Sequence, residues 1–230
     1  MSHLVTVARK EWAELFAERH SRRAMLVQSL FAVLVLGVLN PLASPEAWQH
    51  GSAAAALTYL FFPGFLASTV AADAFAGERE RRTLETLLAT PLSEWAILLG
   101  KAAAAVGFAL LLACAGALAA LVTMAVTAGG LAIAPSLIAG LLAAACASAL
   151  ALTSVAVLVS LRVPVARSAQ QLTALGGLVL AAAVGATWRL AGADTSWRTL
   201  TVTELALVAL AGIVFAAART QFRRERLLEH

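Results

Sequence analysis

The sequence predicts an all-α, polytopic membrane protein with six transmembrane helices, which we treat as a single transmembrane domain over residues 1–230. The chain is 61% hydrophobic and only 13% charged, whereas about a quarter of the residues in a soluble domain are charged. Six apolar stretches are long enough to cross a hydrocarbon core of about 30 Å. Backbone groups in lipid need internal partners, and these stretches lack the period-two alternation of barrel strands, so they predict helices.

The first element, residues 1–23, predicts an amphipathic helix that lies in the membrane interface. One helical side gathers apolar residues and the rest of the helix is charged. Trp12 and Phe16 are the residues that we expect at the membrane interface. The alternative is an ordinary lead-in to the first span. The apolar side consists of Leu4, Ala8, Trp12, Leu15 and Phe16.

The six spans follow one another with short connections. The fifth is the weakest prediction, because Gly176, Gly177 and Gly185 could interrupt a helix there. The connections 41–52, 129–134 and 191–201 are brief, and none is long enough to form a domain on that side of the membrane. The predicted spans cover residues 24–43, 53–75, 102–128, 135–161, 169–190 and 202–218.

The positions of Lys and Arg predict the orientation. Six spans place both termini on one side, and that side collects fifteen of the 17 Lys and Arg residues. Only Arg189 and Arg198 fall on the other side. Because short cytoplasmic loops are enriched in Lys and Arg, we expect both termini to be cytoplasmic in a multi-pass protein of the inner (plasma) membrane.

The insert between the second and third spans, GERERRTLETLLATPLSEWAILLGK at residues 77–101, is the densest polar segment. Its first part predicts a short amphipathic helix that ends near Ala89, because Pro91 disfavours helix at Thr90. Ser93 is a suitable cap for a second helix that runs from Glu94 into the third span. The plainest interpretation is a solvated hairpin whose charges anchor the topology.

The same insert resembles the intracellular signature of ABC type-2 exporter permeases. That signature has a glutamate-rich start, T-L-E, two leucines, T-P and a closing small residue followed by lysine, here Gly100 and Lys101. This chain has Arg82 where the family often has glycine. The resemblance implies that the insert is a coupling helix that docks on an ATP-hydrolysing subunit. The residues that would form it are Glu78, Glu80, Arg82, Thr83, Leu84, Glu85, Leu87, Leu88, Thr90 and Pro91.

The resemblance also implies the partners. Residues 1–230 contain no G-x-x-x-x-G-K-[ST] phosphate loop, so this chain is expected to be no enzyme and to hold no cofactor. ATP and Mg²⁺ would be bound by a separate ATPase chain. Six spans make half a transporter, so a second permease copy or a paralogue would complete it. The spans carry only mild polar residues, which favours a hydrophobic or amphiphilic substrate of an ATP-driven exporter.

Other functions are less well supported by the residues. His3, His20, His50 and His230 all lie outside the spans, which leaves no intramembrane metal site. Asp73 and Glu204 lie near span ends rather than at the bilayer centre, which weakens an ion-driven secondary transporter. We expect Asp73 to pair with a nearby arginine. A non-transport membrane scaffold is the third possibility, and no basic stripe suggests a nucleic-acid partner.

Overall fold

The computed structural model describes residues 2–17, 19–80, 93–128, 133–163, 165–190, 192 and 195–221. Within these residues every regular element is helical, and six helical segments are long and apolar enough to cross a membrane, so the predicted fold class is confirmed. The elements are α1 (Ser2–Ala17), α2 (Arg19–Leu34), η1 (Val35–Leu39), α3 (Asn40–Ala43), α4 (Pro45–Gln49), η2 (Ala53–Ala56), α5 (Leu57–Ala72), η3 (Asp73–Gly77), α6 (Glu78–Glu80), α8 (Glu94–Ala128), α9 (Pro135–Ser160), α10 (Ala166–Leu190) and α11 (Trp197–Gln221).

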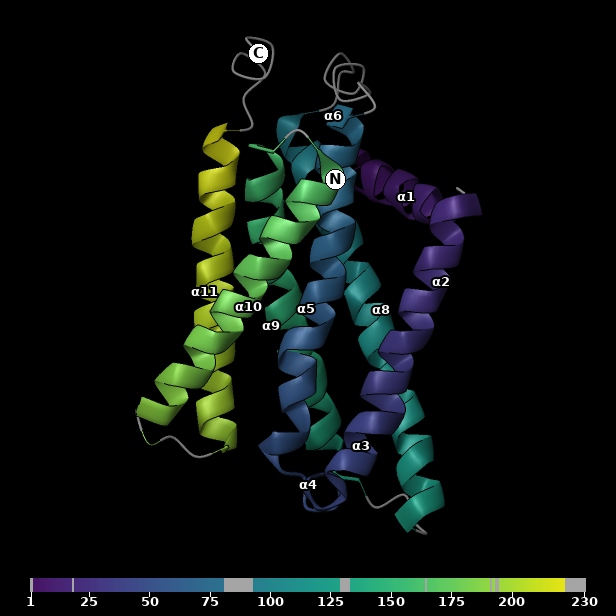
Figure 1. The fold of residues 1–230 in the computed structure, drawn as a ribbon, viewed down its shortest axis with the longest axis vertical. Helices are drawn as coiled ribbons and strands as arrows, with labels where there is room; N and C mark the ends of the chain where they lie inside the picture. Colours follow the sequence, from purple (N-terminus) through teal and green to yellow (C-terminus); the bar gives the residue numbers. More distant parts are fainter. Residues whose placement is uncertain are drawn as a thin grey trace.

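The spanning helices form a bundle in which successive spans run in opposite directions (Figure 1). The first helix, α1, lies across one end of this bundle, where α6 and the end of α11 also lie. We call this the α1 end. At the opposite end are α3, α4, the end of α10 and the start of α11. Arg189 belongs to the last turn of α10 and Arg198 to the first turn of α11, as the predicted charge distribution requires.

Small residues allow the central helices to approach closely. A Cβ at Gly64 on α5 would lie 2.7 Å from the Ser148 carbonyl oxygen on α9, so only glycine fits between the two backbones. A Cβ at Gly116 on α8 would lie 2.6 Å from Leu36 Cβ on η1. Lipid tails are as apolar as leucine, so this close backbone packing is what holds spanning helices together.

The boundaries of the third and fifth spans can be compared with the predictions. Ser93 Oγ accepts a hydrogen bond from the Ala96 amide at 3.2 Å, so the predicted cap at the start of α8 is confirmed. The predicted fifth span is a continuous helix, α10 from Ala166 to Leu190, so its three glycines do not interrupt it. There Gly177 makes room for Phe65, whose Cε1 lies 2.9 Å from where a Cβ would be.

Helices occur at the opposite end where the sequence indicated only a loop. Trp48 on α4 is fully buried, and its Nε1 donates to Asn40 Oδ1 at 2.8 Å. Asn40 in turn donates to Thr58 Oγ1 at 2.6 Å, and Trp197 Nε1 donates to the Gly51 carbonyl oxygen at 2.9 Å. These bonds fasten the residues between the first two spans to the ends of those two spans and to the start of α11.

Candidate functional site

A buried ion cluster lies at the α1 end, and we call its three residues Glu11, Glu78 and Lys101 the Lys101 cluster. Lys101 on α8 has no exposed side-chain surface, and its Nζ lies 2.7 Å from Glu11 Oε1 of α1 and 3.0 Å from Glu78 Oε1 of α6. The same Nζ donates to the Ala74 carbonyl oxygen of η3 at 3.0 Å. One ammonium group therefore joins three parts of the chain that are separate in the sequence: α1, the consecutive elements η3 and α6, and α8.

The surroundings of Lys101 offer its buried side chain several polar and aromatic partners. Its three N–H donors have three oxygen acceptors, two of which carry negative charge. The Phe75 ring centroid lies 5.6 Å from Nζ, within the range of a cation–π contact. Burial raises the pKa of Glu11 above its ordinary value, and the charge of Lys101 offsets part of that rise.

Glu78 enters the cluster through a widened helical turn. The second span continues through the π-helix η3 directly into α6, and Glu78 is the first residue of α6. Gly77 precedes it, and a Cβ there would lie 2.9 Å from Asp73 Oδ1, so the end of the Asp73 side chain would have to shift. A second lysine, Lys10 on α1, approaches Glu78 Oε1 at 3.6 Å from a more exposed position. Single π turns in spanning helices often mark functional positions.

Glu80 connects the insert to a different span. Its Oε2 accepts a hydrogen bond from the Ala166 amide at 3.1 Å, and Ala166 is the first residue of α10. A carboxylate at the amino end of a helix satisfies a free backbone donor and complements the positive end of the helix dipole. The described start of the insert thus contacts α1, α8 and α10.

The interfacial residues expected in α1 are described only in part. Trp12 packs against α8, where a Cβ at Gly107 would lie 3.3 Å from Trp12 Cζ2. The backbone of Phe16 belongs to α1, but its side chain lies outside the described residues. The buried positions of α1 include Val7 and Glu11, so a carboxylate lies on the side that faces the bundle. That α1 lies in a membrane interface stays a prediction.

The structure brings together only the first of the predicted coupling residues. Glu78 and Glu80 lie at the α1 end as described above. The predicted turn after Ala89 and the other coupling residues lie outside the described part of the chain. These are Arg82, Thr83, Leu84, Glu85, Leu87, Leu88, Thr90 and Pro91.

Sequence reasoning did not select Glu11 and Lys101 as site residues. Lys101 is the last residue of the quoted signature, and a lysine at the head of a long apolar run is the signal that could have singled it out. Glu11 gave no such signal, because it belongs to a mixed-charge helix whose charged residues normally face water. Only the fold shows that this carboxylate reaches a lysine ninety positions away in the chain.

The other ionisable candidates do not form a metal site within the described residues, where no group of three His, Cys, Asp or Glu side chains comes together. Asp73 is half-buried in η3 beside Gly77, and its pairing with an arginine stays a prediction. Glu204 is the eighth residue of α11, and its buried Oε1 has no hydrogen-bond partner in the described part of the chain.

A bundle of six helices that are long and apolar enough to span a membrane, with a buried ion cluster tying α1 to the start of the polar insert, defines a multi-pass membrane protein. The family model described as ABC-2 family transporter protein matches residues 5–202. The chain therefore belongs to the ABC-2 family and is a membrane-embedded permease component of an ABC transporter, a family whose membrane components work with an ABC ATPase. No curated protein matches the sequence.

Proposed function

We propose that this chain is the membrane-spanning subunit of an ATP-driven exporter, and that it acts as a dimer coupled to a separate ATPase. Export rather than import follows from the resemblance of the insert to exporter permeases. The substrate would be hydrophobic or amphiphilic, since the spans offer mild polar groups. In this proposal both termini and the insert face the cytoplasm, in agreement with the distribution of Lys and Arg.

The observation that supports coupling best is the set of contacts made by the start of the insert. Glu78 joins α8 and α1 through Lys101, and Glu80 binds the first amide of α10. A force applied to the insert by a docked ATPase would therefore act on two spans as well as on α1. Buried charge pairs resist separation, because losing one partner leaves the other charged and unsolvated. Such a connection suits the transmission of a rigid-body movement.

In this proposal α10 is the span that moves most readily when the ATPase moves the insert. Leu172, Leu175 and Leu178 are about half exposed or more, so α10 packs on the rest of the chain through a narrow strip. Helices with few buried contacts move at low energetic cost. In a dimer, this apolar surface would face either the second copy or lipid. Movement of α10 relative to α8 would then alter the space between the two subunits.

Co-purification tests the coupling directly. The permease is co-expressed with its partner ABC ATPase, and the complex is captured through a tag on the permease. The double substitution Glu85→Lys and Leu88→Asp should release the ATPase while leaving the amount of membrane-inserted permease unchanged, because truncating a central interface residue costs about 2 kcal/mol or more. Glu46→Lys on α4, an exposed carboxylate at the opposite end, is the matched control and should keep the ATPase.

A wild-type yield of ATPase with the double variant would mean that the insert is only a solvated hairpin. Loss of the ATPase with Glu46→Lys as well would show a general effect of charge rather than a docking site. Retention with the control and release with the double variant would support the proposed coupling.

A further inference from the structure

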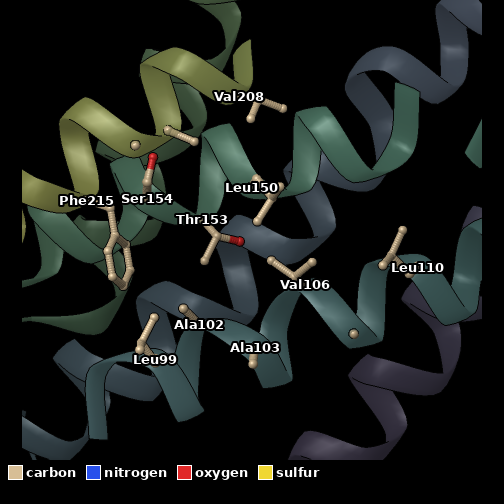
Figure 2. A pocket seen from close by; sticks show the side chains of 13 residues that line it. Leu99, Ala102, Ala103, Val106, Leu110, Leu150, Thr153, Ser154, Val208 and Phe215 are labelled. Carbon is tan, nitrogen blue, oxygen red and sulfur yellow. The ribbon is translucent and has the colours of Figure 1, made fainter. Parts of the chain in front are cut away.

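A groove of about 560 Å³ lies between α8, α9 and α11, and its lining does not include the residues of the Lys101 cluster (Figure 2). Its lining is almost wholly apolar, with Thr153 and Ser154 on α9 as the hydroxyl-bearing exceptions. On α8 the lining runs from Leu99 to Leu110, a rise of about 16 Å at about 1.5 Å per residue. This is half the thickness of a hydrocarbon core, so the groove spans one leaflet only.

The leaflet is the one at the α1 end. Lys101, whose ammonium group must stay at or near the membrane boundary, lies only two residues along α8 from Leu99. The rest of the lining on α8 is deeper in the membrane. The exposed side chains along the rim include Leu99, Leu150 and Val208, so the groove opens to the outside of the chain rather than to its core.

The Thr153 hydroxyl is the one polar group of the lining that needs a partner. Thr153 is only 2% exposed, and its Oγ1 makes no hydrogen bond to any described residue. In Figure 2 this hydroxyl points into the groove. Ser154 differs, because its Oγ donates to the Ala151 carbonyl oxygen at 2.7 Å. A buried hydroxyl without a partner is costly, so a ligand that offers an oxygen acceptor at this depth would be stabilised.

A cation and an aromatic ring lie one helical turn beyond the groove, toward the α1 end. Arg219 on α11 stacks over Trp95 on α8, with 4.3 Å between the guanidinium carbon and the ring centroid. Trp95 precedes Leu99 by four residues, and Arg219 follows Phe215 by four residues, where both Leu99 and Phe215 line the groove. A stacked guanidinium keeps its in-plane N–H groups available, and these match the oxygens of a phosphate.

We propose that the groove between α8, α9 and α11 binds one phospholipid from the leaflet at the α1 end. One acyl chain fills the apolar groove, an ester carbonyl oxygen accepts a hydrogen bond from Thr153, and the phosphate binds Arg219 beside Trp95. The order of these groups along the helices is the order of depth in a lipid: phosphate, ester, then chain. An anionic lipid is favoured, because the cationic Arg219 lies one helical turn beyond Phe215 of the lining, where the phosphate would sit.

The binding test uses the full-length protein in detergent with phosphatidylglycerol or phosphatidylcholine added, and native mass spectrometry counts the lipids that are retained. Wild type should keep one phosphatidylglycerol. Gly212→Leu should lose it, because Gly212 lines the groove and a Cβ there meets no described atom within 4 Å. Gly185→Leu on α10 is the matched control, since its Cβ also meets no described atom within 4 Å and it lies outside the groove.

Two milder variants separate the polar contacts from the shape of the groove. Thr153→Val keeps the volume and removes the hydroxyl, and it should weaken retention about fivefold, the effect of one net hydrogen bond. Arg219→Gln should abolish the preference for phosphatidylglycerol over phosphatidylcholine. Equal retention by wild type and Gly212→Leu, or equal effects of Gly212→Leu and Gly185→Leu, would overturn the proposal.

The alternative occupant is a second copy of this chain, and a crosslinking experiment distinguishes it. Phosphatidylglycerol with a photoreactive group on its acyl chain should label peptides of α8, α9 and α11 in membranes. In the same membranes Gly212→Cys should stay monomeric under oxidising conditions. Formation of a disulfide-linked dimer through Cys at that position would show that protein rather than lipid covers the groove, and would contradict the proposal.

Discussion

Lys101 on α8 lies 2.7 Å from Glu11 on α1, and the two residues are ninety positions apart in the sequence. The bond fixes the helix that lies across the α1 end to the third span. Glu78 of α6 binds the same ammonium group at 3.0 Å. Elements α1, α6 and α8 therefore meet at the ammonium group of Lys101. A movement of the start of the polar insert would act on the third span through this group.

The stability of the cluster should depend on Lys101 far more than on Lys10, although both lysines approach Glu78 Oε1. Lys101→Met leaves two buried carboxylates without their cation and should cost about 3 kcal/mol in the free energy of unfolding. Lys10 is 45% exposed, so Lys10→Met should cost no more than about 0.5 kcal/mol. Thermal unfolding of both variants in detergent measures this difference. Equal losses would show that burial does not govern the cluster.

The free energy of unfolding should change with pH in the direction expected for a carboxyl group whose pKa is raised by burial. Burial raises the pKa of Glu11 in the folded protein above its ordinary value of 4.5. The folded state then binds a proton more readily than the unfolded state, so Glu11 adds most stability below its unfolded pKa and loses this contribution as pH rises through the folded pKa.

Glu11→Gln removes that titration and provides the reference. The melting temperature of wild type minus that of Glu11→Gln should increase as pH falls from about 8 to about 5. A difference that decreases over the same range would mean that Lys101 outweighs burial and that the pKa of Glu11 is lowered.

Gly140 on α9 should tolerate no larger residue. The indole ring of Trp197 occupies the space where a Cβ would lie, and its Nε1 is held by the Gly51 carbonyl oxygen at 2.9 Å. Gly140→Ala should therefore destabilise the protein by about 1–3 kcal/mol through overpacking. Gly185→Ala, at an open helical position, should be neutral or stabilising by up to about 1 kcal/mol. Thermal unfolding of Gly140→Ala and Gly185→Ala measures this difference. Similar melting temperatures for the two variants would contradict the close packing of Trp197 on Gly140.

The orientation can be tested with single cysteines in a background in which the two native cysteines are alanine. Cysteines at His50 and Thr195, near the opposite end, should react with an impermeant maleimide added to intact cells. Cysteines at Glu80 and Arg167, at the α1 end, should react only after the cells are permeabilised. Labelling of the Glu80 position in intact cells would reverse the topology and remove the basis for cytoplasmic coupling.

The fold was predictable because its signals are long and local. Each span needed only length and apolar composition, and the start of α8 needed only Ser93 ahead of Glu94. The fifth span was the least clear of the six in the sequence. Its glycines resemble helix breakers in sequence, but Gly177 is retained because Phe65 packs against it. A close contact between helices leaves no sign in the sequence of either helix alone.

The candidate site was predictable only where a motif marked it. Glu78 and Glu80 were chosen from the resemblance of the insert, and the structure places both at the α1 end. Glu11 was missed because its partner is distant in sequence and its helix reads as a solvated one. In the sequence Thr153 is one of several mild polar residues of the spans, and its place in a groove depends on how α8, α9 and α11 pack.

We propose above all that ATP bound by a separate subunit moves α10 relative to α8. The direct measurement is the electron-spin distance between nitroxide labels at Ser93 and Arg167, which are exposed positions at the starts of these helices. The permease–ATPase complex is placed in lipid nanodiscs, with the native cysteines replaced. Trapping ATP and vanadate should shift the distance distribution, and an ATPase with its phosphate-loop lysine inactivated should leave it unchanged. An unchanged distribution in the active, ATP-trapped complex would contradict the account.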